Sequence, residues 1–155
     1  LPEAQLDRFM FNIKMDYPSF NEEILVVKNT TSDTSVELNK ILNGEQIRFF
    51  QHIVKKIPIA DNVVEYAVKL VSKTRPNSAN ATDKINNYLS WGAGPRASQY
   101  LVLGAKCHAV LQGKYSPDIE DVKAVVIPIL RHRIILNYKA EAEGISVEEI
   151  VKSLL

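Results

Sequence analysis

An arginine directly follows a proline in the stretch WGAGPRAS at residues 91–98. Proline is favoured at the first position of a helix, where an N–H is not needed and φ is already helical, so Pro95 predicts a helix start. The N-terminus of a helix carries a partial positive charge of about half an elementary charge, which disfavours a cation beside it. The position of Arg96 therefore makes sense if an anion binds there, held by the guanidinium and by the free N–H groups of the helix start.

Arg96 could also be accommodated in two ways that need no bound anion. The side chain can lie over the ring of Trp91 and keep its charged end in water. It can also pair with an upstream carboxylate such as Asp83. The sequence leaves all three interpretations open.

Most other kinds of catalytic chemistry are missing from the sequence. It contains no glycine-rich phosphate loop of the form GxxxxGK[ST] and nothing that resembles a catalytic triad. His52, His108 and His132 lie far apart with no second ligand at metal-binding spacing, so no metal site is expected. Cys107 lies in an apolar context that favours a buried side chain over a nucleophile. Any chemistry must therefore be shared with residues outside the chain.

Length and composition are typical of one folded domain. The chain has 155 residues, of which 46% are hydrophobic and 24% charged, values that indicate neither disorder nor a membrane protein. Its 19 basic and 18 acidic residues nearly cancel, which argues against nucleic acid as a partner. A single cysteine, with no signal peptide or long apolar run, predicts a cytoplasmic protein without membrane insertion. Because patterned sequence begins at a leucine, we expect a fragment of a longer protein.

The N-terminal part predicts a short helix, a strand and a second helix. Residues 3–8 are compatible with a helix. Residues 9–15 alternate apolar and polar side chains, which is the period of a strand with one buried face. Because the rest of the sequence offers no partner strand, we expect this strand to be left over from a sheet encoded upstream. Ser19 and Glu22 then form a capping box that starts a helix through Lys28.

The remainder predicts helices joined by turns, because apolar residues recur every three or four positions. Asp61 is expected to cap one helix, and Ser116 with Pro117 to start another. Ser146 and Glu149 form the capping box of the last helix. The residues expected to be buried are Val63, Val64, Ala67, Val68, Leu70 and Val71 in the second long helix, and Ala97, Leu101, Ala105, Val110 and Leu111 in the helix from Pro95 to Gln112 that Gly113 ends.

Two stretches lack the helical period. Residues 29–44 are expected to form a connector, and residues 75–94 the longest loop, a kind of segment that is often functional in a compact domain. We therefore expect a mainly α fold, a bundle of five or six helices with one leftover β-strand at the N-terminus. The expected division is a sliver of an upstream core domain at residues 1–17 and a helical domain at residues 18–155.

The motifs LPEAQLDRF at residues 1–9 and GAGPRAS at residues 92–98 occur in the order and near the spacing seen in the MoxR family of AAA+ ATPases. The chain resembles that family over essentially its whole length, and the segment ILRHRI at residues 129–134 adds to the likeness. The resemblance implies the helical lid of an AAA+ ATPase, with the ATP-binding loop and the Mg²⁺-binding carboxylates lying upstream. The implied cofactors are ATP and Mg²⁺ in the whole protein, with none bound tightly by this chain alone.

Arg8 receives a role from this resemblance. It falls where related AAA+ proteins place the arginine finger, which reaches the γ-phosphate held by a neighbouring subunit. A guanidinium suits this role because it is always charged and can bond two oxygens at once. The alternative is a surface arginine paired with Glu3 or Asp7.

Arg96 falls at the position that the family calls sensor 2, so the resemblance implies that its anion is a nucleotide phosphate. Pro95 and Gly94 of the same turn would then contribute to nucleotide binding. The family commonly has serine where this chain has Gly94, a difference that removes a hydroxyl and leaves the turn more flexible.

Arg131, His132 and Arg133 form the densest cationic cluster of the sequence. Adjacent helical side chains point about 100° apart, so one ligand cannot contact all three. The resemblance allows one arginine to face the nucleotide or a subunit interface, and of the two, Arg133 is the weaker candidate and Arg131 the stronger. The alternative is a charged, solvated turn beside Pro128.

The resemblance implies a ring oligomer that couples ATP binding and hydrolysis to chaperone-like remodelling or maturation of partner proteins. Such proteins often work beside a partner with a von Willebrand A domain, and this chain alone is expected to be inactive. The alternatives are a non-catalytic helical interaction module and the lid of a DNA-handling AAA+ motor. The absence of a basic groove around the aromatic residues argues against base stacking, so these are expected to pack in the core or loops: Tyr66, Tyr88, Trp91 and Tyr100.

Overall fold

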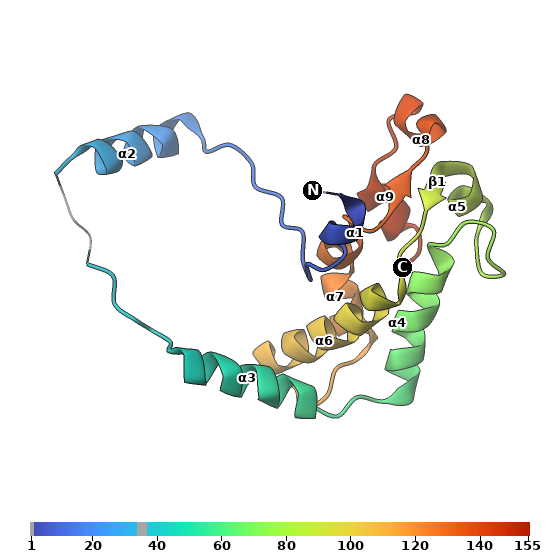
Figure 1. The fold of residues 1–155 in the computed structure, drawn as a ribbon, viewed down its shortest axis with the longest axis horizontal. Helices are drawn as coiled ribbons and strands as arrows, with labels where there is room; N and C mark the ends of the chain where they lie inside the picture. Colours follow the sequence, from blue (N-terminus) through green and yellow to red (C-terminus); the bar gives the residue numbers. More distant parts are fainter. Residues whose placement is uncertain (1, 34–36) are drawn as a thin grey trace.

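The fold is mainly helical, as the sequence predicts, in a computed structural model that describes residues 2–33 and 37–155 (Figure 1). Three helices make up its centre: α4 (Asp61–Lys73), α6 (Pro95–Leu111) and α7 (Ile119–Leu130). Around them the described residues form α1 (Glu3–Leu6), α2 (Phe20–Thr31), α3 (Gly44–Lys56), α5 (Asp83–Tyr88), α8 (Tyr138–Ala142) and α9 (Val147–Lys152), and two short strands, β1 (Leu89–Trp91) and β2 (Ile135–Leu136).

The core lies where α4, α6, α7 and α9 meet. Small side chains on one face of α6 let α7 approach closely, and a Cβ placed on Gly104 would lie 3.1 Å from Val125. Val68, Val110 and Leu111 are exposed, so their predicted burial is wrong; Leu111 lies in the last turn of α6, where no element covers it. The predicted core residues that are buried are Val63, Ala67, Leu70, Val71, Ala97, Leu101 and Ala105.

The strand predicted at residues 9–15 does not form. A strand needs a partner, and within the described residues this segment makes only scattered bonds, such as that from the Asn12 N–H to the Pro128 carbonyl at 2.8 Å. The strands that do form are β1 and β2, which pair antiparallel. Strand β1 lies in the segment that was expected to be the longest loop, and β2 lies beyond Pro128 where no strand was predicted. Strands of two and three residues carry no readable period.

Three of the predicted helix starts are correct and two are wrong. Pro95 is the first residue of α6. The capping boxes at Ser19 and Ser146 are present. At α4 the N-cap is Ala60, so Asp61 is the first helical residue instead of the cap. At α7 the N-cap is Asp118, which forms a capping box with Asp121, and the helix begins later than Ser116 and Pro117 predict. The Asp118 carboxylate accepts from the Asp121 N–H and the Asp121 carboxylate accepts from the Asp118 N–H, at 3.1 and 2.8 Å, a reciprocal pairing that Ser116 cannot make from outside the helix.

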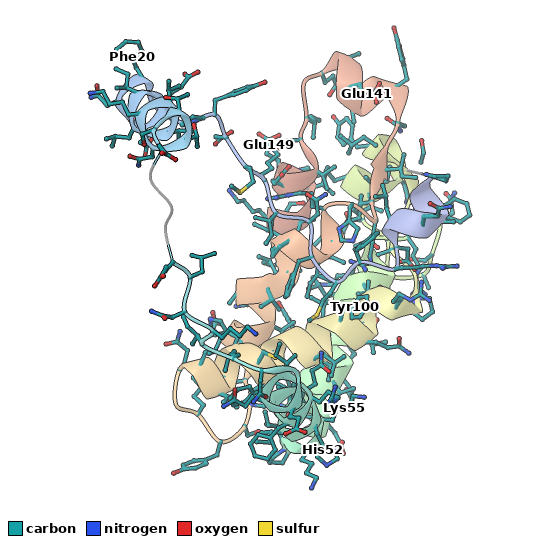
Figure 2. The ribbon with its side chains drawn as sticks, turned by 60° about the vertical axis from the view of Figure 1, so that its left-hand side comes forward. Phe20, His52, Lys55, Tyr100, Glu141 and Glu149 are labelled. Atoms are coloured by element: carbon teal, nitrogen blue, oxygen red, sulfur yellow. The ribbon has the colours of Figure 1, made fainter. Side chains whose placement is uncertain are left out.

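Helix α2 lies away from the other helices, at the end of an arm formed by residues 11–19 (Figure 1). Figure 2, turned by 60°, shows the same separation, with Phe20 far from the helical body that holds Tyr100. None of the side chains of α2 is buried, and Leu25 is 57% exposed although it is apolar. The connector expected at residues 29–44 overlaps the end of α2 at residues 29–31; residues 34–36 of it lie outside those described, and residues 37–43 are not helical.

A buried carboxylate holds the start of α7 against the end of α6. Asp121 has no exposed surface, and its carboxylate lies 2.7 Å from Nδ1 of His108 and 3.1 Å from Nζ of Lys114. Burial alone would raise the pKa of Asp121, but the hydrogen bond from the Asp118 N–H and those from His108 and Lys114 outweigh it and lower the pKa to about 2. Asp121 is therefore ionised in the folded chain at any ordinary pH.

This cluster predicts a loss of stability in acid. Because the folded pKa of Asp121 is lower than the ordinary 3.8, its contribution is complete above that value and is lost as the pH falls toward about 2. We expect the difference in unfolding free energy between the wild type and Asp121→Asn to shrink over that range. Urea unfolding from about pH 7 to 2 measures it, with Asp16→Asn as an exposed control. A difference that stays constant with pH would contradict this assignment.

No helix of the described residues is both long and apolar enough to span a membrane.

Candidate functional site

The turn that leads into α6 is held by close backbone contacts. The Ala93 N–H donates to Oγ1 of the buried Thr74 at 2.9 Å, and Nε of Arg75 donates to the Ala93 carbonyl at 3.0 Å. Gly92 lies so close to this partner segment that a Cβ there would be 2.3 Å from the Thr74 carbonyl oxygen. Gly94 is the N-cap of α6 and offers no side-chain hydrogen bond, so the helix start lacks the side-chain cap that a serine could give.

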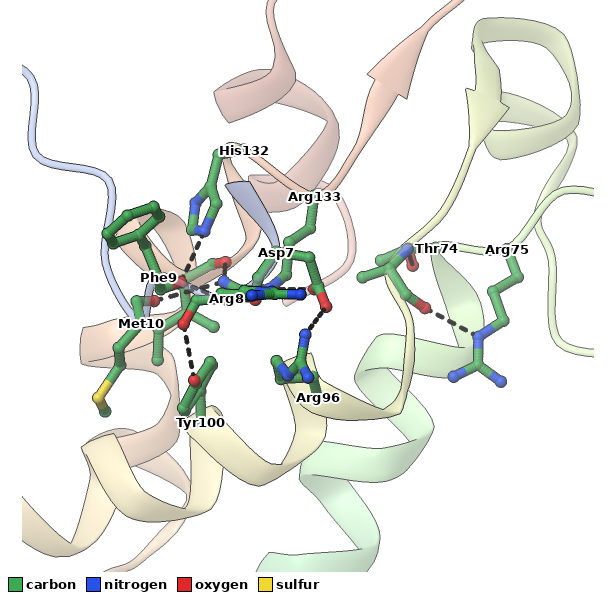
Figure 3. Close-up of polar contacts among 12 residues, drawn as sticks. Asp7, Arg8, Phe9, Met10, Thr74, Arg75, Arg96, Tyr100, His132 and Arg133 are labelled. Atoms are coloured by element: carbon green, nitrogen blue, oxygen red, sulfur yellow. Dashed lines mark hydrogen bonds and ion pairs between the residues drawn. The ribbon is translucent and has the colours of Figure 1, made fainter. Parts of the chain in front are cut away.

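Arg96, in the first turn of α6, meets a carboxylate from the N-terminal segment of the chain (Figure 3). Its Nη1 lies 2.7 Å from Oδ2 of Asp7. Pairing with an upstream carboxylate is one of the interpretations that the sequence leaves open, although the partner is Asp7 and not Asp83. The Arg96 side chain is 44% exposed, so it keeps donors that face water.

Arg133 is buried and binds the same carboxylate from the other side, with Nε 3.0 Å from Oδ1 of Asp7. Its Nη2 donates to the carbonyls of Asp7 and Phe9, at 2.9 and 2.5 Å. Its Nη1 donates to the carbonyls of Met10, at 3.3 Å, and Ile129. A guanidinium has five N–H donors, and these five acceptors use all of them. Arg133 thus has no donor left for a ligand.

Arg8 combines a hydrogen-bonded backbone with an exposed side chain. Its carbonyl accepts a hydrogen bond from the hydroxyl of Tyr100 at 2.9 Å, one turn beyond Arg96 on α6. Its side chain is exposed, and within the described part of the chain its guanidinium has no hydrogen-bond or ion-pair partner. In the described residues Arg8 is not paired with Asp7, because Asp7 already bridges two other arginines. The alternative partner Glu3 has a side chain that lies outside those described.

Arg131 and His132 also bond backbone carbonyls of the N-terminal segment. Nε of Arg131 lies 2.9 Å from Oε1 of Glu148 on α9, and its Nη1 donates to the Asn12 carbonyl at 3.2 Å. His132 donates from Nε2 to the Phe9 carbonyl at 3.0 Å, since a carbonyl can only accept. Burial lowers the pKa of His132, which favours the neutral ring. The side chains of the cationic cluster at residues 131–133 therefore donate to the chain's own backbone carbonyls.

Two hollows flank the turn before α6. One, of about 420 Å³, is lined by Arg75 and Pro95 among others, and the second, of about 380 Å³, is lined by Asp7 and Arg133. Trp91 lines both and is 69% exposed. No three His, Cys, Asp or Glu side chains of the described residues gather where they could hold a metal ion.

The structure brings together the predicted site residues Arg8 and Arg96. It adds three residues that the sequence did not place in the site, Asp7, Tyr100 and Arg133. Arg96 and the backbone of Arg8 lie at the same end of α6, joined through Asp7 and Tyr100. The sequence indicates Asp7 only as a partner of Arg8, favours Arg131 over Arg133, and predicts Tyr100 as a packing residue. One sequence signal could have pointed to Arg133. This arginine lies beside apolar runs in ILRHRIIL, and an arginine that is buried there needs many hydrogen-bond acceptors.

Comparison with known proteins identifies the class to which the chain belongs. A model of the AAA lid domain matches residues 83–154. YeaC from Bacillus subtilis is 34% identical over 156 aligned residues, which cover 100% of this chain and 46% of that protein. The chaperone MoxR1 of Mycobacterium tuberculosis is 32% identical, with 100% of this chain and 41% of that protein covered. The crystal structure of a candidate ATPase from Cytophaga hutchinsonii superposes with a TM-score of 0.87 at 34% identity, over 99% of this chain and 47% of that one.

The fold and the lid-domain match define the chain as the lid region of an AAA+ protein. It spans less than half the length of the relatives it matches. Within that class the chain belongs to the MoxR family, as its similarity to MoxR1 and to MoxR of Paracoccus denitrificans indicates.

Proposed function

We propose that this region presents two guanidinium groups, those of Arg96 and Arg8, to the triphosphate of ATP in an ATP-hydrolysing MoxR-type protein. The observation that carries the proposal is the contact between Arg96 and Asp7, the residue that precedes Arg8. Because Tyr100 also joins α6 to the Arg8 carbonyl, both arginines lie at one end of that helix. One triphosphate is large enough to meet both.

The start of α6 fits an anion. Its N-cap is a glycine and, like the N-cap of α4, makes no side-chain hydrogen bond, whereas α2, α3, α7 and α9 begin with capping boxes. Arg96 is partly exposed beside it and shares its carboxylate with Arg133. A phosphate would supply the acceptors that the helix start and the guanidinium otherwise find in water and in Asp7.

The remaining parts of the reaction would come from outside this chain. ATP and Mg²⁺ would be held chiefly by a phosphate loop and carboxylates in the rest of the longer protein, and ATP supplies the phosphoryl group that is transferred to water. Arg8 would serve the site of a neighbouring subunit in a ring. We further propose that the protein uses hydrolysis for chaperone-like remodelling of partner proteins, with a von Willebrand A domain protein as one candidate partner and the cytoplasm as its compartment.

The proposal predicts that Arg96→Ala in the full-length protein lowers ATP turnover by roughly 10- to 100-fold, since one charge-assisted hydrogen bond to phosphate is lost. Steady-state phosphate release measures the effect. Arg48→Ala is the matched control, because Arg48 is an exposed arginine on α3. If Arg96→Ala and Arg48→Ala hydrolyse ATP as fast as the wild type, Arg96 binds no nucleotide and the lid is better described as an interaction module.

A double variant tests whether both arginines meet one anion. If they do, Arg8→Ala and Arg96→Ala together should cost less than the product of their separate effects, because each weakens the same transition state. Separate effects that multiply would indicate two independent sites.

A further inference from the structure

Four consecutive backbone carbonyls, those of residues 7–10, accept hydrogen bonds from only a few side chains of the helical domain (Figure 3). Tyr100 bonds the carbonyl of Arg8, and Arg133 bonds the carbonyls on both sides of it. The N–H of Arg8 donates to the Gln5 carbonyl at 3.2 Å, so both polar backbone groups of this residue are paired. The backbone at Arg8 is therefore fixed relative to α6 and α7.

His132 adds a bond to the Phe9 carbonyl, and the two side chains nearest to Arg8, those of Tyr100 and Arg133, also contact each other. The guanidinium of Arg133 lies over the ring of Tyr100, 5.1 Å from its centroid. Arg133 is buried with its donors all in use, which excludes it as a ligand-binding group. A buried charge is costly unless it is fully paired, and four of the five acceptors of Arg133 belong to residues 7–10, the fifth being the Ile129 carbonyl. This pairing indicates a specific structural purpose.

The side chain of Arg8 has the opposite character. It is exposed and has no partner among the described residues. A guanidinium that must reach a phosphate from another subunit gains little if its own backbone moves, because a misplacement of about 1 Å can cost about a hundredfold in rate. A fixed backbone beneath a free side chain is the arrangement that such a group needs.

We propose that Arg133 and Tyr100 are positioning residues for Arg8: they fix its backbone so that its guanidinium is presented at a constant place to a neighbouring nucleotide. This inference rests on the proposed function of Arg8. It assigns to Arg133 a role that requires the planar fork of arginine, since five donors in fixed directions are needed to bond the carboxylate and the carbonyls together.

The test uses the full-length protein and measures ATP turnover. Tyr100→Phe removes one neutral hydrogen bond to the Arg8 carbonyl and should lower kcat by roughly three- to tenfold while KM for ATP changes less than about twofold. Arg133→Lys keeps the charge but loses the fork, and should lower kcat by more than Tyr100→Phe does. Thermal unfolding of each variant establishes that it is folded.

Matched controls exist on the same chain. Tyr88→Phe removes a comparable hydroxyl bond, to Glu143 at 2.7 Å, away from the segment that holds Arg8. Arg48→Lys makes the same change as Arg133→Lys at an exposed arginine on α3, away from that segment. Both controls should leave kcat near that of the wild type. If Tyr88→Phe lowers kcat as much as Tyr100→Phe, the effect is general destabilisation and the inference is wrong.

The Tyr100→Phe change in the Arg8→Ala variant separates a role in positioning Arg8 from a merely structural role. In Arg8→Ala, where no guanidinium remains to be positioned, Tyr100→Phe should have no further effect on single-turnover hydrolysis. An equal loss in both backgrounds would overturn the inference. If Arg8→Ala itself leaves turnover unchanged, the proposed function fails; if Arg8→Ala lowers turnover and Tyr100→Phe does not, only the positioning role fails.

Discussion

Replacement of Arg8 by alanine in the full-length protein is expected to lower ATP turnover at least about a thousandfold while nucleotide binding to the same subunit is retained. The guanidinium is exposed, and among the described side chains it has no hydrogen-bond or ion-pair partner that the substitution would remove. What it removes is a charge that would balance the negative charge developing on the transferred phosphoryl group. Multiple-turnover phosphate release and equilibrium nucleotide binding measure the two quantities.

The same variant shows whether Arg8 acts on a neighbour. Arg8→Ala subunits mixed with subunits whose own phosphate loop is disabled should recover part of the turnover, because the second kind still offers an intact Arg8 to the first. Arg48→Ala provides the control for charge loss on an exposed helix. Full activity of Arg8→Ala alone would contradict the assignment, and a loss without recovery on mixing would place its action within one subunit.

The replacement Gly92→Ala is expected to destabilise the fold by about 3 kcal/mol and to lower the melting temperature by roughly 10 °C. An added Cβ would lie 2.3 Å from the carbonyl oxygen of Thr74, 2.6 Å from its carbonyl carbon and 2.7 Å from Cα of Arg75. These are backbone atoms, so no side chain can turn away to make room. The turn must move, and the bond from the Ala93 N–H to Thr74 would be lost with it. Thermal unfolding followed by circular dichroism measures the change.

The same motif contains its own control. A Cβ on Gly94 meets nothing within 4 Å, so Gly94→Ala should change the melting temperature little. Gly94→Ser can supply the missing N-cap oxygen of α6 and should stabilise the fold by about 0.5–1 kcal/mol. Equal melting temperatures for Gly92→Ala and Gly94→Ala would show that the turn is not held as tightly as its contacts indicate.

Helix periods and capping boxes account for what the sequence predicted correctly about the fold. Apolar residues at helical spacing located α4 and α6, and Ser19 and Ser146 located two helix starts. Strands β1 and β2 were missed because pairing between residues about 45 positions apart leaves no local signal. The strand expected at residues 9–15 does not form, because alternating apolar and polar side chains are a local pattern and a strand also needs a partner strand to pair with.

The candidate site was predictable only in part. The proline before Arg96 and the charge of a helix start indicated an anion near that residue, and the structure has the Asp7 carboxylate there. The bridge from Asp7 to Arg133 spans 126 positions in the sequence. Periodicity and motif spacing cannot reveal such a contact, because it depends on how the N-terminal segment packs against α7 and on which carbonyls remain unpaired.

The bonds between residues 7–12 and the helical domain should make the two move together. Carbonyls and a carboxylate of this segment are tied to α6 and to the residues that follow α7, and the Asn12 N–H is tied to Pro128. A rotation of the helices would carry Arg8 along as part of one rigid body. In the proposed ring, such a rotation in one subunit would move the Arg8 guanidinium toward or away from the nucleotide of the next subunit. Movement of the lid would then couple neighbouring nucleotide sites.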